Sequence, residues 1–316
     1  WWPWLRRGLG GAFFLLVAWL LVAQARTIDW RQVFAALQAY PAATLCGAGA
    51  LAAASHLLYS SFDLLGRRYT GHTLGTRTVM GITFVSYAFN LSLGSAVGSV
   101  AFRYRLYSRL GLRLGLIARI TSLSLLANWV GYLLLAGLIF GLRPPALPPG
   151  WLIDSAGLRL GGFVLLALAL AYLGACAFAR QRMFWLRGHA VDLPSLQLAA
   201  LQVAMGAANW LLMSGIVFVL LGGRIDFLSV ASALLLAAVA GVITHVPGNL
   251  GVLEAVFVAL LAPRLPAPEV LAAVVAYRIL YYFVPLGLAT LVYLLMEARA
   301  GPAAGGQSAG PPRPWA

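Results

Sequence analysis

The sequence has little charge, few cysteines and no lysine at all. Of its 316 residues, 9% are charged and 62% are hydrophobic, and the mean hydropathy is +0.88. A soluble domain has about 25% charged and about 45–50% apolar residues, so too few charges remain here to cover a soluble surface. The composition excludes a water-soluble enzyme and a disordered chain. It also leaves no soluble domain that would bind nucleic acid.

Motifs for catalysis and for metal binding are also missing. The two cysteines, Cys46 and Cys176, lie in apolar runs without a neighbouring cysteine at CxxC spacing. The sequence has no HExxH, no P-loop and no paired carboxylates that would hold Mg²⁺. Asp63 and Glu254, the main carboxylates within apolar runs, lie on distant segments. We therefore expect no catalytic residue, no metal and no cofactor, and we expect that the chain is not an enzyme.

What the sequence does contain is a series of long apolar runs separated by arginines. A membrane-spanning helix needs about 20 mostly apolar residues. The runs that qualify, or that come close, are 8–25, 42–64, 78–101, 120–141, 159–179, 196–221, 228–262 and 270–296. All 22 basic residues are arginines, against eight acidic residues, and this excess suits loops that face an anionic leaflet.

The distribution of arginines selects a topology. If all eight runs crossed the membrane, ten arginines would lie on one side and eleven on the other, against the positive-inside rule. If 78–101 and 228–262 instead enter and return, 15 arginines lie on the side of both termini. The six on the opposite side are then Arg26, Arg31, Arg143, Arg159, Arg224 and Arg264. The rule therefore favours six full spans, two re-entrant hairpins and cytoplasmic termini.

Each predicted hairpin contains a break where the chain can reverse. Glycines and serines crowd the second half of 78–101, and the sequence HVPGNLG interrupts 228–262. Crossing twice takes about 40 residues, so the 24 residues of 78–101 predict a half-depth hairpin. Hairpins that enter from opposite faces are typical of inverted-repeat transporters, which makes an inverted repeat a candidate arrangement. A glycine-rich packing helix over 78–101 is the alternative.

The predicted fold class is thus an all-α polytopic membrane protein with one transmembrane domain, residues 8–298. Residues 1–7 are predicted to be a cytoplasmic N-terminus. Residues 299–316, which are rich in glycine, proline, alanine and serine, are predicted to be a disordered cytoplasmic tail.

Ionisable residues within apolar runs are candidate functional groups, because a charge there costs at least a few kcal/mol. They are His56, Asp63, His245, Glu254 and Arg278. Glu254 and Arg278 lie on segments joined by a short loop, so they can pair. Two interpretations stay open: a structural ion pair, or a headgroup site in which Arg278 binds a phosphate and Glu254 holds it or carries a proton.

The arginine-rich segment 103–113 supplies further candidates for headgroup binding. On a helix, Arg105, Arg109 and Arg113 share one face beside a leucine stripe, as in an amphipathic helix that lies in the membrane interface. Arg103 and Arg105, which are closer to the hairpin, are the better candidates to contact a headgroup. An anchor that only fixes orientation is the alternative role, above all for Arg109 and Arg113.

Several uncharged residues at the breaks are candidates to line a cavity. Asn90 and Asn249 fall at the two breaks, and we assign the same role to His245, Tyr277 and Tyr281. Interhelical hydrogen bonds are the usual explanation for such polar groups. A proton relay through His56 or His245 is a further hypothesis, beside simple packing.

Five segments resemble the YbhN-like inner-membrane proteins, in the family named for the transmembrane region of lysylphosphatidylglycerol synthase. They are 87–91, 103–112, 128–132, 245–257 and 276–282, and the likeness extends over about residues 15–298. The resemblance implies a flippase-like domain of the bacterial inner membrane. In the family's multiple peptide resistance factors, a related domain moves aminoacylated phosphatidylglycerol and is fused to a soluble aminoacyltransferase. This chain ends at Ala316 without such a domain, so aminoacyl transfer is not expected.

The sequence and the resemblance together predict a lipid translocase or lipid-binding membrane protein. The expected partners are anionic phospholipids such as phosphatidylglycerol or cardiolipin, with a homodimer left open. The alternative is a proton-coupled transporter of a small solute. The two functions require different surroundings for the substrate site. A flippase needs a site that opens laterally to lipid, whereas a solute transporter needs a site whose walls are closed to lipid.

Overall fold

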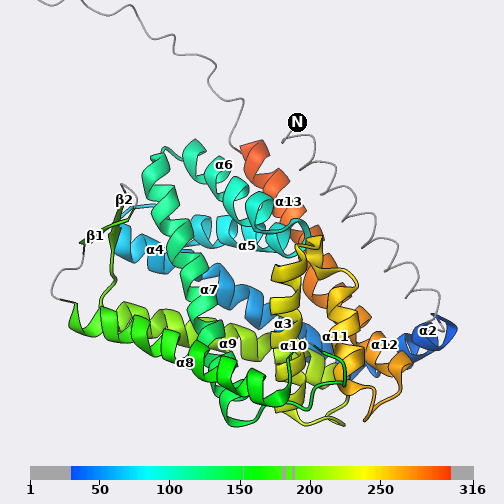
Figure 1. Ribbon diagram of the computed structural model, residues 1–316. Helices are drawn as coiled ribbons and strands as arrows, with labels where there is room; N and C mark the ends of the chain where they lie inside the picture. Colours follow the sequence, from blue (N-terminus) through cyan, green and yellow to red (C-terminus); the bar gives the residue numbers. More distant parts are fainter. Residues whose placement is uncertain (1–29, 152, 180–182, 187–188, 300–316) are drawn as a thin grey trace, which may run out of the picture.

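The computed structural model describes residues 30–151, 153–179, 183–186 and 189–299, and this part of the chain is helical apart from one small β-hairpin (Figure 1). The predicted span 8–25, the N-terminal residues 1–7 and the tail beyond residue 299 lie outside the described residues. The elements are α2 (Trp30–Gln38), α3 (Ala42–Ser60), α4 (Phe62–Thr70), α5 (Thr76–Leu93), η1 (Ser95–Ala101), α6 (Phe102–Arg109), α7 (Leu114–Leu142), α8 (Ser155–Phe178), β1 (Met183–Leu186), β2 (His189–Asp192), α9 (Leu196–Leu220), α10 (Phe227–Thr244), η2 (Pro247–Asn249), α11 (Val252–Leu261), α12 (Ala267–Arg278), η3 (Ile279–Phe283) and α13 (Val284–Arg299).

The described chain contains six helical stretches that are long and apolar enough to cross a membrane, which confirms the all-α polytopic class. They are Ala42–Thr70, Leu114–Leu142, Ser155–Phe178, Leu196–Leu220, Phe227–Thr244 and Ala267–Ala298. Five coincide with predicted spans. The sixth, α10, belongs to the segment predicted as the second hairpin, and its 18 residues extend about 27 Å, close to the hydrocarbon thickness of about 30 Å. Re-entrance and an inverted repeat stay predictions.

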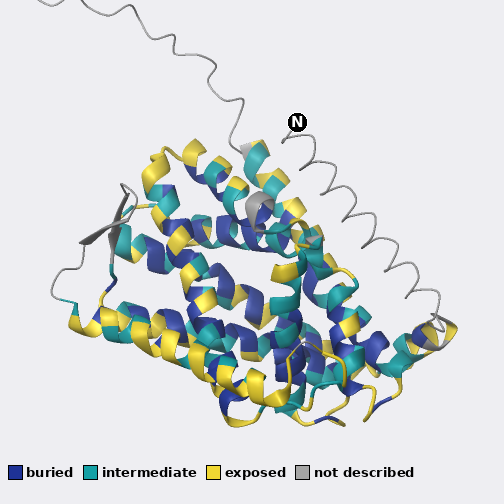
Figure 2. Cartoon of the chain, viewed as in Figure 1, coloured by how far each residue is buried: buried dark blue, intermediate teal, exposed yellow. Residues whose placement is uncertain are grey.

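Helix α7 lies at the centre of the bundle, between α8 and α9 (Figure 1). Glycines allow this close packing: a Cβ on Gly131 would lie 2.3 Å from the backbone of Gly206 in α9. Much of α8 is exposed (Figure 2). Its exposed residues include large apolar ones such as Leu160 and Phe163. Exposed apolar side chains of this kind suit contact with lipid tails.

Three of the long helices begin at a polar residue that caps the first turn. Asp154 accepts a hydrogen bond from the backbone N–H of Gly157, Ser195 from Leu198, and Asp226 from Ser229. These caps satisfy N–H groups that the helix itself leaves unpaired.

The chain reverses direction between α5 and η1, inside the first predicted hairpin. Gly94 joins them with a φ of 86°, a conformation that favours glycine. Gly98 then packs against the α5 backbone, since a Cβ there would lie 2.0 Å from the amide nitrogen of Asn90. Eight residues of continuous helix would separate these positions by about 12 Å, so the segment folds back on itself.

The second reversal lies between α10 and α11, in the predicted break. His245, Gly248, Asn249 and Gly251 all have positive φ there. This turn meets the end of α5 (Figure 1), because a Cβ on Gly248 would lie 3.4 Å from the carbonyl oxygen of Ser92. The two breaks, which are about 150 residues apart in the sequence, are therefore in contact in the structure.

The segment 103–113 is not one amphipathic helix, so that interpretation is wrong. Helix α6 ends at Arg109, and Gly111 follows with a φ of 82°. A residue in the left-handed region ends a helix, and glycine is the residue that adopts it most readily. Arg113 instead precedes the first residue of α7, so it does not share a helix face with Arg105 and Arg109.

Candidate functional site

Buried polar side chains gather in three clusters in the described part of the chain. The first, here called the enclosed pair, consists of Asp63 and Arg103. The second, the break pair, consists of Glu254 and Arg278. The third, the tyrosine network, surrounds Tyr281 and joins α3, α5, α9 and η3.

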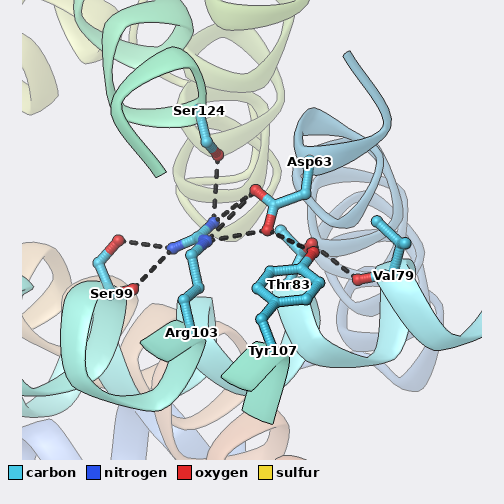
Figure 3. A network of polar contacts seen from close by, with 7 residues as sticks. All are labelled: Asp63, Val79, Thr83, Ser99, Arg103, Tyr107 and Ser124. Carbon is cyan, nitrogen blue, oxygen red and sulfur yellow. Dashed lines mark hydrogen bonds and ion pairs between the residues drawn. The ribbon is translucent and has the colours of Figure 1, made fainter. Parts of the chain in front are cut away.

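The enclosed pair connects α4, α6 and α7 (Figure 3). Arg103 donates to both carboxylate oxygens of Asp63, with Nε 2.9 Å from Oδ2 and Nη2 3.0 Å from Oδ1. Nη1 donates to the carbonyl and the hydroxyl of Ser99, and Nη2 also donates to Ser124. The hydroxyl of Tyr107 donates to Oδ2 of Asp63 at 3.0 Å. Both charged side chains are 0% exposed.

This geometry uses the whole hydrogen-bonding capacity of Arg103. A guanidinium has five N–H groups, and each of them has an acceptor here. Nε and Nη2 each donate to Asp63, Nη1 donates twice to Ser99, and Nη2 also donates to Ser124. A headgroup contact at Arg103 would therefore require this network to open. Headgroup binding by Arg103 stays a prediction, and the contacts themselves describe a structural lock between helices.

The break pair fixes the turn between α10 and α11. Arg278, at the end of α12, donates through Nε and Nη2 to the two carboxylate oxygens of Glu254 in the first turn of α11. Nη1 donates to the carbonyl of Gly248 at 2.8 Å, and Nη2 to that of Asn249 at 2.7 Å. The ring of Tyr282 lies 5.3 Å from the guanidinium carbon. The pairing of Glu254 with Arg278, which the sequence allowed, is therefore present.

The two pairs share one structural role, because each arginine binds backbone carbonyls of an irregular segment. Arg103 binds the carbonyl of Ser99 in the π-helical η1, and Arg278 binds two carbonyls of the 245–251 turn. Irregular backbone within a membrane needs such partners, since no water is present to satisfy it.

The surface around the second break is apolar and exposed. Large side chains are 43–70% exposed within three residues of the turn or next to a residue that contacts it. They are Val242, Ile243 and Leu250 along the chain, Leu93 next to Ser92, and Ile279 next to Arg278. Within this surface the side chain of Glu254 is 20% exposed and that of Arg278 is 7% exposed. His245 is exposed as well. The break pair thus lies beside exposed apolar side chains, and Glu254 is the more exposed of its two members.

Asn249 stabilises the turn by reaching across the hairpin. Its side-chain amide donates to the carbonyl of Ala237 in α10 at 3.1 Å. Gly241 makes room for it, because a Cβ on Gly241 would lie 1.7 Å from the Asn249 side-chain oxygen. The φ of Asn249 is 57°, which is within the range that asparagine tolerates. The predicted cavity-lining role of Asn249 stays a prediction.

The tyrosine network lies inside the bundle. The hydroxyl of Tyr281 is 2.7 Å from that of Tyr87 and 2.7 Å from that of Ser55, which donates to Asn209. Tyr277 stacks on Tyr281 with ring centroids 5.3 Å apart. Both predicted tyrosines are buried. They lie within packed protein, and their role in lining a cavity stays a prediction.

The remaining predicted residues lie outside these clusters. Arg105 is exposed on α6, where it pairs with Glu297, and Arg109 pairs with the same carboxylate. Asn90 is half-buried at the first reversal, where its carbonyl accepts the N–H of Gly94. Among the described residues, no group of three or more His, Cys, Asp or Glu side chains could hold a metal ion.

Sequence reasoning missed most of the enclosed pair's partners. Asp63 was recognised only as an ionisable residue in an apolar run. A signal was available, because Ser99, Arg103 and Tyr107 are spaced four residues apart and so share one helical face. The partners in the tyrosine network, Ser55 and Asn209, carry no comparable spacing signal.

Comparison with known proteins places the chain among inner-membrane proteins. The family model described as "Lysylphosphatidylglycerol synthase TM region" matches residues 9–289. The chain is 44% identical over 300 residues to the inner membrane protein YbhN of Escherichia coli, covering 95% of this chain and 94% of the relative. It is 33% identical over 286 residues to the uncharacterized protein slr0712 of Synechocystis, covering 90% and 88%. The relatives and the apolar helices together support a multi-pass inner-membrane protein.

Proposed function

Because this chain belongs to the family of the lysylphosphatidylglycerol synthase transmembrane region, we propose that it binds anionic phospholipids and moves them between the leaflets of the inner membrane. Phosphatidylglycerol and cardiolipin are the lead substrates. The proposal assigns no chemical reaction and no cofactor to the chain.

The observation that carries the proposal is the position of the break pair. Glu254 and Arg278 lie where the two chain reversals meet, beside a lateral surface of exposed apolar side chains. A phospholipid that approached this surface would keep its acyl chains against the apolar residues while its phosphate reached Arg278. A guanidinium suits a phosphate because it donates two parallel hydrogen bonds.

Glu254 gives the site a means of release. In the structure its carboxylate occupies the donors that a phosphate would take. An entering phosphate would replace this carboxylate, and the carboxylate would replace the phosphate when the lipid leaves. The N-terminus of α11, which begins at Val252, adds a favourable field for either anion.

Arg105 and Arg109 would act at a distance from this site. Both are exposed on α6 and share one carboxylate, Glu297, so the group keeps a net positive charge. Such a group attracts anionic lipids to the surface without holding one.

A proton-coupled solute transporter is the second candidate, and the surface around the break decides between them. A solute site needs walls that exclude lipid, whereas Ile243 and Leu250 are at least half exposed at this break. The lateral exposure favours a lipid substrate.

The test is transport in proteoliposomes with fluorescent phosphatidylglycerol in one leaflet. We expect the wild type to move this lipid faster than fluorescent phosphatidylcholine. The double variant Glu254→Gln/Arg278→Gln should be inserted normally and inactive. The matched control is Arg264→Gln, which removes an exposed ion pair with Asp226 away from the break and should transport normally. Wild-type vesicles without transport, or a double variant as active as the wild type, would refute the proposal.

A further inference from the structure

His56 is a buried titratable residue that the proposed lipid site does not use. It lies in α3 and is 4% exposed. Its Nε2 is 3.2 Å from the backbone carbonyl oxygen of Tyr281. Its other ring nitrogen, Nδ1, is buried and has no hydrogen-bond partner in the described chain. Buried polar atoms are almost always hydrogen-bonded, so an exception of this kind needs an explanation.

The contact with Tyr281 fixes which nitrogen carries the hydrogen. A carbonyl oxygen only accepts, so Nε2 must donate, and a neutral ring then has a bare lone pair on Nδ1. A proton can bind there without a change of tautomer and without the loss of an existing hydrogen bond. The bond to Tyr281 would become charge-assisted and therefore stronger.

Aromatic side chains surround the ring of His56, and no carboxylate of the described residues forms a hydrogen bond or ion pair with it. The rings of Tyr281, Tyr87 and Phe84 lie around His56, at centroid distances of 4.8, 5.3 and 5.7 Å. Aromatic rings attract a cation within about 6 Å. Burial makes an imidazolium costly here, and contact with these rings offsets part of that cost.

Few other titratable or charged groups face this ring from the helices packed against α3. Tyr87 of α5 and Tyr281 of η3 are in ring contact with it. From α9, Asn209 reaches the adjacent Ser55, and neither residue titrates. Asp63 of α4 is bound by Arg103.

The hydrogen bond from His56 connects it to the break pair. Tyr281 belongs to the π-helical η3, which follows Arg278 directly in the chain. A π-helical turn rearranges the hydrogen bonds of a helix and often occurs at functional sites. A stronger bond to the Tyr281 carbonyl would therefore act on the segment that joins Arg278 to α13.

We propose that Nδ1 of His56 is a proton-binding site that couples movement of lipid to a proton gradient. The proton comes from bulk water and forms an imidazolium, and no bond within the protein breaks. The coupling rests on the proposed lipid transport, whereas proton binding at His56 is a separate property that can be measured without it.

The first experiment is nitrogen NMR of ¹⁵N-histidine-labelled protein in lipid nanodiscs, over the pH range in which the protein stays folded. His56→Gln assigns the His56 signals among the four histidines. We expect a protonated Nε2 and a bare Nδ1 at high pH, and an imidazolium as the pH falls. The contrary result is an Nδ1 signal that at every pH remains that of a neutral ring accepting a hydrogen bond. Nδ1 would then bind a water molecule and not a proton, and the inference would be overturned.

The second experiment applies a pH gradient to the proteoliposomes. Gln at position 56 keeps a donor for Tyr281 but cannot be protonated, so His56→Gln should transport lipid without a gradient and lose the acceleration that the gradient gives the wild type. His72→Gln, in the loop after α4, is the control and should keep this acceleration. A gradient response that survives in His56→Gln overturns the coupling. If no variant moves lipid, the proposed function and the coupling fail, and the NMR titration still decides whether His56 binds a proton.

Discussion

The enclosed pair and the break pair are built from the same chemistry but stand in different surroundings. In both, an arginine binds a carboxylate and the carbonyls of an irregular segment. Asp63 and Arg103 are fully buried between three helices, and hydroxyl groups complete their contacts. Glu254 and Arg278 lie at the meeting point of the two reversals, partly exposed beside an apolar surface.

This difference separates a structural from a functional role. A buried ion pair contributes little net stability, but the loss of one partner is costly because the other charge remains buried. Such a pair holds one arrangement of helices. A pair that is accessible at a break can exchange one partner for an outside anion, which is what the proposed lipid site requires.

The largest effect is expected from breaking the enclosed pair. Asp63→Ala should destabilise the protein by about 3–5 kcal/mol, because Arg103 stays buried without its carboxylate. The apolar double variant Asp63→Leu/Arg103→Met should recover much of this loss. Unfolding in detergent, followed by circular dichroism, measures both. A stable Asp63→Ala protein would contradict the structural role of the pair.

At the break pair, function should be lost before stability. Arg278→Gln leaves Glu254 partly exposed, so we expect a smaller destabilisation than at the enclosed pair. The double variant Glu254→Gln/Arg278→Gln removes both charges and should be stable and inactive. Arg278→Lys should also lose transport, because an ammonium cannot form the two parallel bonds of a guanidinium. Thermal unfolding and lipid transport measured on the same samples test this difference, and a double variant that transports normally would contradict it.

A smaller change, the loss of one tyrosine hydroxyl, should also distinguish the two pairs. Tyr107→Phe removes a hydrogen bond to the carboxylate of Asp63 and should destabilise by about 1.5–3 kcal/mol. Tyr282→Phe retains the ring beside Arg278 and should cost less, at most about 0.5–1.5 kcal/mol, which is the range for a hydrogen bond between uncharged groups. Chemical denaturation of the two variants compares them directly, and equal losses would remove the distinction.

Labelling should locate the α6 end of the molecule relative to the membrane. The variant Ser108→Cys places a thiol between the exposed Arg105 and Arg109, and it should react from the side on which both termini lie. Arg105→Gln/Arg109→Gln should leave the unfolding temperature unchanged, because both ion pairs are at the surface. The same double variant should weaken the preference for anionic over zwitterionic lipid in native mass spectrometry. Reaction of the Ser108→Cys thiol from the periplasm would refute the hairpin topology.

The smallest effect on stability is expected at the exposed ion pair of Asp226 and Arg264. This pair serves as a reference for the enclosed pair and the break pair. Burial alone would raise the pKa of Asp226, but hydrogen bonds from Ser229 and Arg264 lower it below its usual 3.8. Ionised Asp226 therefore contributes stability that is present above pH 3.8 and is lost as the pH falls through the lowered pKa. Asp226→Asn should remove this acid dependence from the unfolding temperature. An unchanged dependence would show that other carboxylates account for it.

Part of the candidate site could be predicted from the sequence because its signals are local. A charged residue in an apolar run is rare, so Glu254 and Arg278 were evident, and the short loop between their segments allowed them to pair. Gly94 and the sequence HVPGNLG marked the reversals, because each supplies residues that adopt positive φ. The arrangement of Arg103 was not evident, because the spacing of Ser99, Arg103 and Tyr107 indicates a shared helix face but not that Asp63, 40 residues away in the chain, lies against it.

The sequence by itself determined the class of the protein, since its apolar length and scarcity of charge allow only a helical membrane protein. It also indicated the two reversals, at Gly94 and at HVPGNLG, because glycine adopts positive φ readily, but it did not indicate the break at Gly111. Only the tertiary structure decided that Arg103 is enclosed by Asp63, that the two breaks meet, and that Ser55 and Asn209 join the tyrosines. The physical reason is that these contacts join segments up to 226 residues apart, and they form only when helices with nearly uniform apolar surfaces have packed in one particular way.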